Sequence, residues 1–456
     1  MKVFSLRGQK KIAELVKKRQ LKIAVVGLGK MGLPLAIAFA LRDFSVLGVD
    51  INHRVVKKIN SSFCPFPGEP DLPKQLEKVI KSKNLKATTN FSLAIEHADV
   101  VILLVPTLID KERKPDLSAL EKALNSVGKY LKKGTVVILE STVPPGTTSG
   151  IVKKKLEKIS SLKSGVDFGL AFCPERTNSG TALKDIGGRL NPKIVGGLEM
   201  KSRLIAKLLY QQINKKGVVE VSSLTMAEMV KLSEMIYRDV KIAYANSLAL
   251  ICAQLKIDVQ ELIAATNTDV GCQILKPGAG VGGHCIPVYP HFLISRKLKQ
   301  LDLLKSSRKI NDTMPSFVVQ RVMEALKECN LQIKRSSCLV LGIAYRGGVK
   351  EIRFSPGIEI CKLLKKKGLE VFVFDPLFEK KEMEDLGLKY KADFKGIDCL
   401  VLATLHEEFK KIDLEILTRE MKNKIFVDTT FHFQIKDFRQ KGFIFKNLSY
   451  NFSRNE

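Results

Sequence analysis

The stretch LKIAVVGLGKMG, residues 21–32, decides the fold class of this chain. Leu21 to Val26 is a short, mostly apolar run bounded by glycine, which is typical of a buried strand in a parallel sheet. The glycines that follow have the spacing G-x-G-x-x-G, and a helix is predicted to begin near Met31. A strand, a glycine turn and a helix in this order indicate a doubly wound α/β domain.

The same turn is a candidate dinucleotide site. Glycines permit the tight turn and let the backbone approach a pyrophosphate, whose charge then lies at the N-terminus of the helix. The alternative is a glycine turn that binds no ligand. The residues expected to contact the dinucleotide here are Gly27, Gly29, Lys30, Met31 and Gly32.

The end of the second predicted strand indicates which dinucleotide binds. Asp50 lies about 20 residues beyond the motif, where a carboxylate accepts hydrogen bonds from the adenosine ribose and repels a 2′-phosphate. NAD is therefore favoured over NADP, although the nearby Arg54 is a residue that can accommodate a 2′-phosphate. Thr107 and Thr142 follow two further strands, and their hydroxyls either reach the cofactor or belong to simple turns.

The alternation of strands and helices continues and is then repeated. Further strands are predicted at residues 45–49, 100–105, 135–139 and 167–172, one long helix at 223–255, and a second set of strands at 337–342, 370–374, 399–402 and 424–427. We predict an α/β protein with two Rossmann-like, doubly wound domains joined by a helical central region that contains the long helix. The expected divisions are a basic N-terminal helix (1–20), an NAD-binding domain (21–205), a central region (206–329) and a C-terminal domain (330–456).

Composition restricts the class of protein. A chain of 456 residues, 45% of them hydrophobic, is too long for one compact core and should divide into domains. No uncharged apolar stretch reaches the roughly 18 residues that span a bilayer, and the N-terminus has no secretory pattern, so we expect a cytoplasmic protein without a membrane partner. Nine cysteines at irregular spacings predict neither a zinc site nor a disulfide framework, so no metal is expected.

The net charge of +29 allows three interpretations: a nucleic-acid partner, an acidic membrane surface or an anionic substrate. The lysines are scattered, with short runs such as Lys153 to Lys155, and no basic helix carries interleaved aromatic residues. We therefore favour a generally lysine-rich composition over nucleic-acid binding. A phosphorylated substrate would gain from the same field.

A second glycine-rich segment, PGAGVGGHCIP at residues 277–287, ends in a cysteine. Its four glycines make the backbone flexible and permit close approach just before Cys285. A thiol presented in this way, close to cationic groups that favour the thiolate, can attack an aldehyde carbon. The alternative is a glycine-rich turn with an unreactive cysteine.

These motifs occur in one order together with several others. They are GLGKMGLPLA (27–36), the turns Val-Pro-Thr and Ser-Thr-Val-Pro-Pro-Gly-Thr-Thr, Cys-Pro-Glu-Arg (173–176), Lys231 in the long helix, GVGGHCIP (280–287), LGIAYR (341–346) and IRFSP (352–356). From about Leu21 to the C-terminal lobe, the chain resembles the UDP-glucose/GDP-mannose dehydrogenase family. The resemblance implies NAD as cofactor, a UDP-sugar as substrate bound by the C-terminal domain, and a homodimer or higher homo-oligomer.

The resemblance also implies a reaction, in which two NAD molecules in turn oxidise the primary alcohol of the sugar to a carboxylate. Lys231 would handle the alcohol proton or stabilise oxyanion charge, Cys285 would trap the aldehyde and pass through a thioester, and Glu175 would position or activate water. The positions that match substrate contacts of the family are Arg176, Thr177, Arg238, Gly282, His284, Tyr345 and Arg346, and Arg353 is assigned to the cofactor.

Within the family, Glu175-Arg176 and the His284 before the cysteine favour UDP-N-acetyl-D-mannosamine as the substrate. UDP-N-acetylglucosamine, UDP-glucose and GDP-mannose are the alternatives.

The chain departs from the pattern of the family at four positions. Met235 replaces an Asn one helical turn beyond the lysine, and Tyr289 replaces an Asp four residues after the cysteine. Gly271 replaces an arginine that in relatives reaches the site of the neighbouring subunit, and Ser247 replaces a common Glu. These changes leave open a function of another class, a nucleotide-sugar binding protein that does not complete both oxidations.

Overall fold

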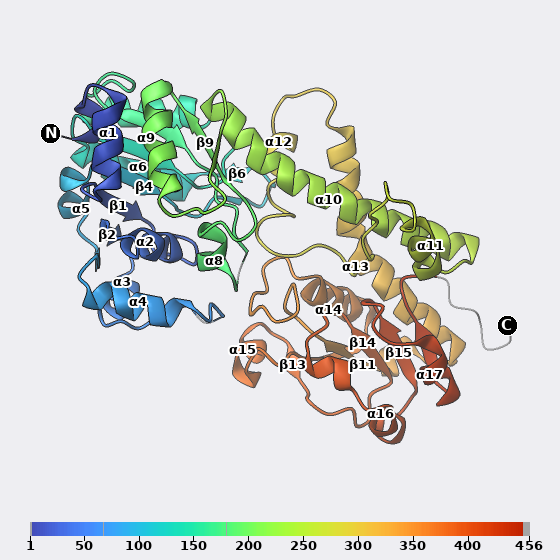
Figure 1. Ribbon diagram of the computed structural model, residues 1–456. Helices are drawn as coiled ribbons and strands as arrows, with labels where there is room; N and C mark the ends of the chain where they lie inside the picture. The colour runs from blue at the N-terminus through green and yellow to red at the C-terminus, as the bar shows by residue number, and fades with distance from the viewer. Residues whose placement is uncertain (1, 67, 179, 450–456) are drawn as a thin grey trace. The chain divides into compact units, whose positions relative to one another are not determined.

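The computed structural model describes residues 2–66, 68–178 and 180–449. The chain forms two compact units (Figure 1): the first extends to Glu234 and includes His291–Arg296, and the second comprises Met235–Pro290 and the chain from Lys297 onward. The predicted fold class is confirmed, since two sheets of parallel type are connected through a helical central region.

An eight-stranded sheet forms the centre of the first unit. Its order is β10-β9-β8-β7-β4-β1-β2-β3, and neighbouring strands are parallel except β8 and β9. The bounds are β1 Lys22–Val26, β2 Ser45–Val49, β3 Leu85–Thr88, β4 Val100–Leu103, β7 Val136–Leu139, β8 Gly169–Phe172, β9 Lys193–Gly197 and β10 Val218–Glu220. The run β3-β2-β1-β4-β7-β8 has the order of a dinucleotide-binding sheet, in which ligands bind at the carboxyl ends of β1 and β4, where the order reverses.

The helices of the first unit lie before, between and after these strands in the sequence. They are α1 Gln9–Lys17, α2 Gly32–Ala40, α3 His53–Asn60, α4 Leu72–Lys81, α5 Phe91–His97, α6 Ser118–Tyr130, α7 Lys153–Ser160, α8 Ala182–Ile186, α9 Met200–Gln211 and α12 His291–Ile294, with a π-helical turn at Thr148–Val152 and a two-stranded ribbon of β5 Leu108–Ile109 and β6 Pro115–Asp116. Every residue of α2 is buried, as its sequence GLPLAIAFA, which has no polar side chain, requires. This burial fixes the helix that follows the glycine turn.

Two long helices contribute to the central region. The first, α10 Leu224–Leu255, begins in the first unit and ends in the second, and it starts one residue later than predicted because Ser223 Oγ accepts the Met226 N–H as an N-terminal cap, at 3.1 Å. The second, α13 Asp302–Glu328, has Pro315 in its interior. A short helix, α11 Val259–Thr266, lies between them in sequence.

The sheet of the second unit has six parallel strands in the order β13-β12-β11-β14-β15-β16. The strands are β11 Ser337–Leu341, β12 Glu370–Phe374, β13 Lys389–Tyr390, β14 Cys399–Leu402, β15 Ile425–Asp428 and β16 Ile444–Lys446, and the helices between them are α14 Pro356–Lys367, α15 Lys380–Asp385, α16 Leu414–Glu420 and α17 Ile435–Gln440. The strand order is again that of a dinucleotide-binding sheet, so the two units share a topology.

The first strand of each sheet ends in the same kind of glycine turn. Gly27 after β1 and Gly342 after β11 have φ of +95° and +89°, in the left-handed region that favours glycine. A Cβ at Gly32 would lie 1.8 Å from the carbonyl oxygen of Gly27, and one at Gly357 would lie 2.3 Å from that of Gly342. In both turns, therefore, a second glycine lets the following helix start directly against the turn.

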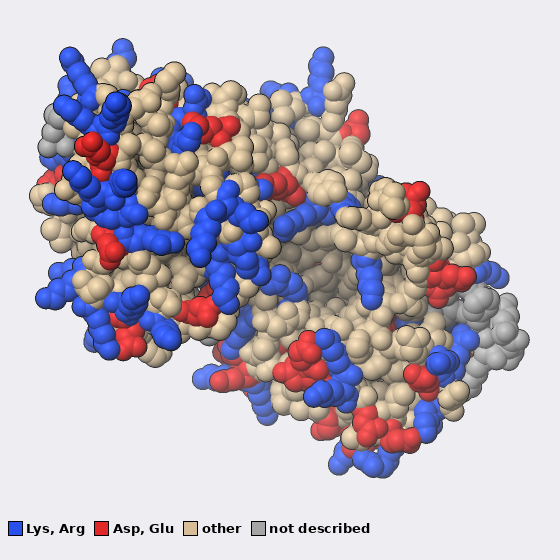
Figure 2. Space-filling model, viewed as in Figure 1, with Lys and Arg blue, Asp and Glu red and all other residues tan. Residues whose placement is uncertain are grey.

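The surface carries its positive charge in a dispersed form. Lys and Arg side chains cover much of the face in Figure 2, with Asp and Glu among them. This distribution agrees with the scattering of lysines along the sequence. Among the residues that the structure describes, none of the helices combines the length and the apolarity needed to cross a membrane.

Candidate active site

Gly27 and Gly29 of the first turn differ in the space that surrounds them. A Cβ at Gly27 would lie 2.3 Å from the carbonyl oxygen of Leu104, so the turn itself requires this residue. At Gly29, in contrast, a Cβ would have no protein atom within 4 Å. The protein thus leaves open space beside Gly29, at the start of α2, where a pyrophosphate can approach the backbone.

Asp50 lies beside the first glycine turn and is only partly buried. It follows β2, its Oδ2 accepts the Leu28 N–H at 2.8 Å, and its Oδ1 accepts the Asn52 N–H at 2.9 Å. Because each carboxylate oxygen can accept a further hydrogen bond, ribose hydroxyls still have acceptors here. The first turn therefore fits NAD, with Asp50 and the glycines as the groups that would bind it.

Asp375 is the acid of the second unit that corresponds to Asp50, and it is hydrogen-bonded within its own domain. Asp375 follows β12, is fully buried, and accepts the N–H groups of Ile343 and Ala344, both at 2.8 Å, as well as lying 3.1 Å from His406 Nε2. Its oxygens bind the turn of its own domain. The two acids therefore differ in burial, since Asp375 is fully buried and Asp50 is only partly buried.

Two loops at the carboxyl edge of the first sheet are joined by hydroxyl groups. Thr107, after β4, donates its Oγ1 proton to the carbonyl oxygen of Thr142, after β7, at 2.5 Å. Ser141 Oγ accepts the Val105 N–H at 2.8 Å and donates to the Val105 carbonyl oxygen at 2.7 Å. The structure thus brings together the two threonines that were expected near the cofactor, and it uses the hydroxyl proton of Thr107 within the loop.

Two of the predicted catalytic residues form a pair in the first unit. Lys231 Nζ lies 3.7 Å from Glu175 Oε2, and Lys231 is 3% exposed. Lys231 comes from α10, whereas Glu175 follows β8, so residues far apart in sequence meet here. A lysine almost removed from water and held beside a carboxylate can accept or return a proton and stabilise nearby negative charge.

The residues after Glu175 connect this pair to the glycine turn. Thr177 donates its N–H to Glu175 Oε1 and its hydroxyl to Met31 Sδ, the latter at 2.8 Å. Arg176 binds within the protein, with Nη2 2.7 Å from Glu234 Oε1 and Nη1 donating to the Pro192 carbonyl oxygen at 2.8 Å. Recognition of a substrate phosphate by Arg176 would therefore have to compete with Glu234.

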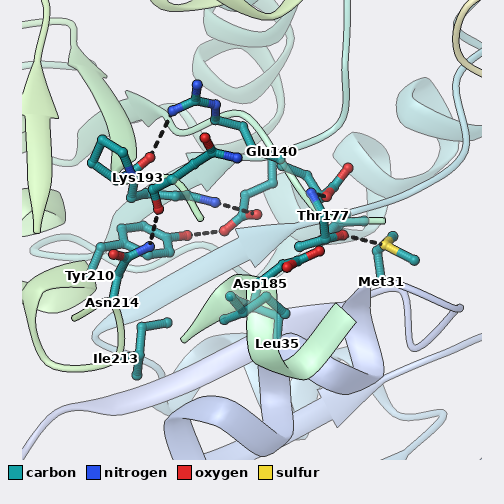
Figure 3. A pocket seen from close by; sticks show the side chains of 15 residues that line it. Met31, Leu35, Glu140, Thr177, Asp185, Lys193, Tyr210, Ile213 and Asn214 are labelled. Atoms are coloured by element: carbon teal, nitrogen blue, oxygen red, sulfur yellow. Dashed lines mark hydrogen bonds and ion pairs between the residues drawn. The ribbon is translucent and has the colours of Figure 1, made fainter. Parts of the chain in front are cut away.

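Sequence reasoning missed a buried polar cluster beside this loop. A pocket lined by Met31 and residues 175–177 is also lined by Glu140, Lys193 and Tyr210 (Figure 3). Lys193 Nζ lies 2.8 Å from Glu140 Oε2, and the Tyr210 hydroxyl donates to Glu140 Oε1. Burial raises the pKa of Glu140, whereas the Lys193 ammonium opposes this rise. The position of Glu140 directly after β7 was a usable signal, because ligands bind at this edge of the sheet.

In the second unit, Cys285 lies in the glycine loop and is partly buried. Its Sγ donates to the hydroxyl of Tyr289 at 3.9 Å. Tyr289 is itself 8% exposed and is the residue that replaces the usual Asp. The departure from the family pattern therefore places a phenol, instead of a carboxylate, against the candidate nucleophile.

Several of the predicted substrate residues contact the same loop. A Cβ at Gly282 would lie 2.5 Å from Tyr345 Cβ, and the N–H of Gly283 donates to the Arg353 carbonyl oxygen at 2.8 Å. The guanidinium of Arg346 lies 6.0 Å from the ring centroid of Tyr345. Residues 345–353 thus pack on the segment that ends in Cys285.

The other expected residues lie in the loop itself, on α10 or after α11. His284 is half-buried in the loop, and Arg238 is exposed on α10. Met235, the replacement for Asn, is 6% exposed on the same helix. Gly271 follows the exposed Val270, in the connection after α11.

Three family models match the chain in succession. They describe the NAD binding domain (residues 21–214), the central domain (225–313) and the UDP binding domain (339–434) of the UDP-glucose/GDP-mannose dehydrogenase family.

Individual relatives match almost the whole chain. The UDP-N-acetyl-D-mannosamine dehydrogenase of Pyrococcus horikoshii is 37% identical over 408 residues, covering 90% of this chain and 95% of that protein. The protein of the same name from Methanocaldococcus jannaschii is 37% identical over 426 residues, covering 90% and 92%. The solved structure of the Pyrococcus horikoshii UDP-D-ManNAc dehydrogenase superposes with a TM-score of 0.85 at 35% identity, covering 94% of this chain and 99% of that one.

The open glycine turn with its ribose acid, in a sheet of this order, defines an NAD-dependent dehydrogenase. The chain belongs to the UDP-glucose/GDP-mannose dehydrogenase family. The predicted family, cofactor and enzyme class are confirmed, and the protein is a nucleotide-sugar dehydrogenase that uses NAD.

The open space at Gly29 predicts a selective loss of cofactor binding. In Gly29→Ala the added methyl meets no protein atom, so the unfolding temperature should not change, but it occupies the space of the pyrophosphate. Overpacking costs roughly 1–3 kcal/mol, so the Kd for NAD should rise by about 5- to 150-fold in calorimetric titration. Gly150→Ala, which also has no protein atom within 4 Å, is the matched control and should bind NAD normally. An unchanged Kd in Gly29→Ala would contradict the proposed approach of the pyrophosphate.

Proposed function

We propose that this enzyme oxidises the primary alcohol of UDP-N-acetyl-D-mannosamine to the carboxylate, with two NAD molecules in succession. The observation that carries this choice of sugar is that relatives 37% identical over about nine-tenths of the chain are named for this substrate. The pairing of Lys231 with Glu175 and the glycine loop around Cys285 support the type of chemistry.

In the first oxidation, Lys231 accepts the proton of the alcohol or stabilises the alkoxide as it forms. NAD supplies the hydride acceptor for each of the two oxidations. Glu175 Oε2 lies 3.7 Å from Lys231 Nζ and is the nearby carboxylate to which the proton can pass on, and the low exposure of Lys231 keeps competing water away from its amino group. The product of this step is the aldehyde.

In the second oxidation, the Cys285 sulfur adds to the aldehyde carbon and forms a C–S bond, while the thiol proton passes to the aldehyde oxygen, giving a thiohemiacetal. Loss of a hydride from this carbon and of the hydroxyl proton converts it to a thioester. Water then breaks the C–S bond, giving the carboxylate and the free thiol, and Glu175 orients that water or accepts its proton. The Tyr289 hydroxyl, which contacts the sulfur, takes the place of the usual acid beside the nucleophile.

The remaining residues are assigned to binding. We propose that residues 21–205 hold NAD, with Arg353 as a further cofactor contact, and that residues 330–456 hold the uridine nucleotide. Guanidinium groups suit bidentate phosphate recognition. The proposed substrate contacts are Arg176, Thr177, Arg238, Gly282, His284, Tyr345 and Arg346.

We further propose that the enzyme is a cytoplasmic homodimer formed through the central region, residues 206–329. On α10, the exposed apolar side chains of Tyr237, Tyr244, Ile251 and Leu255 recur at intervals of seven and four residues, so they lie along one face of the helix. A stripe of this kind suits a second copy of the chain, and the mass of the protein in solution tests it.

A substrate panel tests the proposed function. Purified enzyme with UDP-N-acetyl-D-mannosamine should form two NADH per sugar, and kcat/KM should be lower with UDP-N-acetylglucosamine, UDP-glucose and GDP-mannose. A higher kcat/KM with one of these would reassign the sugar. Absence of NADH with all four would contradict the proposal.

The second candidate function is a nucleotide-sugar binding protein without turnover. The observation that favours it is the phenol of Tyr289 in contact with Cys285, together with the buried Met235. This function predicts that a UDP-sugar binds in calorimetry while no NADH is formed.

A further inference from the structure

The side-chain amide of one buried residue forms a hydrogen bond with the start of the glycine loop. Asn246, on α10, is completely buried, and its Oδ1 accepts the N–H of Gly278 at 2.9 Å. Gly278 is the first glycine of the segment that ends in Cys285. A buried side chain thus holds the backbone of the loop directly.

Asn246 is in turn oriented by a residue of α13. Its Nδ2 donates to Asn311 Oδ1 at 2.9 Å, and Asn311 Nδ2 donates to Asp239 Oδ1 at 2.7 Å and to the Asp239 carbonyl oxygen at 3.0 Å. Asp239 can only accept at these two oxygens, so the amide nitrogen of Asn311 must face it. The oxygen of Asn311 then faces Asn246, whose own oxygen must turn to Gly278.

The far end of this network is charged and buried. Arg308 Nη1 lies 2.6 Å from Asp239 Oδ1, and Arg308 Nη2 pairs with Asp312. Arg308 and Asp239 are 3% and 1% exposed. Burial raises the pKa of Asp239, and the Arg308 guanidinium opposes that rise. A buried ion pair is poor evidence for stability alone, and its better-attested role is to specify one arrangement of its neighbours.

The packing around Pro315 adds a steric restraint on the same loop. Proline has no N–H, so Pro315 cannot bind the carbonyl oxygen of Asn311 four residues earlier in α13. Gly280 lies at this gap: its φ is +135°, and a Cβ there would be 3.4 Å from the Asn311 carbonyl oxygen and 3.3 Å from Pro315 Cδ. The loop therefore fits against the helix at the point where its regular hydrogen bonding is interrupted.

The other side of the loop is fixed separately. Gly283 donates its N–H to the Arg353 carbonyl oxygen at 2.8 Å. The chain from Gly278 to Gly283 is thus tied at both ends, and Cys285 follows two residues later. A change in either of these two hydrogen bonds would move the thiol of Cys285.

We propose that Asn246, oriented by Asn311 and Asp239, is a positioning residue for Cys285. By holding Gly278, it presents the thiol in one place, so that the sulfur reaches the aldehyde carbon of the substrate in a reactive geometry. This inference rests on the proposed role of Cys285 as the nucleophile. The restraint on the loop is independent of that role.

The variant Asn246→Asp tests the inference with pH as the variable. An ionised aspartate cannot donate to Asn311 Oδ1, whereas a protonated one has the shape of the amide and can again donate to Asn311 and accept from Gly278. The charged groups of the surrounding network are Asp239, Arg308 and Asp312. At alkaline pH we expect kcat to fall about 100-fold, the scale of a 1 Å misplacement, while the KM values for NAD and nucleotide sugar are unchanged.

As the pH is lowered, the ratio of variant to wild-type kcat should rise toward one, because protonation restores both hydrogen bonds. A ratio that is the same at every pH, or a loss that appears in KM instead of kcat, would overturn the inference. Asn246→Ser, whose shorter side chain cannot reach both partners, should show the loss without the recovery. It also provides a second measurement if the aspartate variant does not fold.

A measurement without turnover separates this inference from the proposed function. Hydrogen exchange of the peptide that spans Gly278 to Gly283 should become faster in Asn246→Ser. Asn423→Ala, which removes a 2.6 Å hydrogen bond to Asp398 elsewhere in the second unit, is the matched control and should leave both loop exchange and kcat unchanged. Unchanged exchange in Asn246→Ser would overturn the inference even in an active enzyme. A wild-type protein inactive on all nucleotide sugars would contradict only the proposed function.

Discussion

Replacement of Cys285 by alanine is expected to stop carboxylate formation, with a fall in kcat on the order of 10³-fold or more, since loss of a covalent nucleophile removes a whole step of the pathway. The second oxidation needs a tetrahedral carbon that still carries a hydrogen, and the thiohemiacetal formed by Cys285 provides it. In the variant, the first oxidation can still occur, so at most one NADH per sugar should form.

The matched control is Cys272→Ala. Cys272 belongs to the same unit and, like Cys285, is partly buried, but it lies before the glycine loop. It should retain two NADH per sugar. Absorbance at the NADH band gives the stoichiometry, and mass spectrometry of the sugar product separates aldehyde from carboxylate. A carboxylate formed at the normal rate by Cys285→Ala would remove this thiol from the mechanism.

The fold was predictable where the signal is contiguous in sequence. Strands β1, β2, β12 and β14 are apolar runs bounded by turn residues, and their predicted ends agree with the structure to within one residue. The glycine turn after β1 was predictable because its spacing, the strand before it and the helix after it are all local. Helix α10 was predictable because its apolar residues recur over 32 positions.

Elements without such a signal were not predicted. Strand β3, Leu85–Thr88, has the sequence LKAT with two apolar residues. It is recognisable only through its pairing with β2. Helix α13 contains Pro315, which interrupts the pattern by which a helix of 27 residues would be recognised. Its polar side chains Arg308 and Asn311 point into a buried network, which inverts the usual relation between polarity and exposure.

The site residues also divide into those that could be predicted from local sequence and those that could not. Motif residues such as Glu175 and Lys231 could be named from their order in the sequence, but their 3.7 Å approach depends on the tertiary packing that brings α10 to the loop after β8. The cluster of Glu140, Lys193 and Tyr210 joins three segments that share no motif, so the partners of Glu140 are known only from the folded chain. Local sequence therefore identifies reactive groups, whereas their partners follow from tertiary packing.

The second large effect is expected for Lys231→Met. Methionine fills most of the buried space but can neither accept a proton nor stabilise an alkoxide, and general acid–base groups contribute about 10²–10⁴-fold, so kcat with the alcohol substrate should fall by that range. If Lys231 serves mainly the first oxidation, the same variant supplied with the sugar 6-aldehyde should still form one NADH and the carboxylate through Cys285. The NADH rate with alcohol and with aldehyde measures this difference.

The control for this comparison is Lys207→Met, which removes an ion pair with Glu220 at the surface of the same unit and should change neither rate. Equal losses with alcohol and aldehyde in Lys231→Met would mean that the lysine also acts after the aldehyde has formed. Its position beside Glu175, the residue proposed to activate water, would then assign it to the hydrolysis of the thioester. Full activity with the alcohol would exclude Lys231 as the proton acceptor. The ratio of the two losses thus assigns the lysine to a step, because Cys285 acts only after the aldehyde has formed.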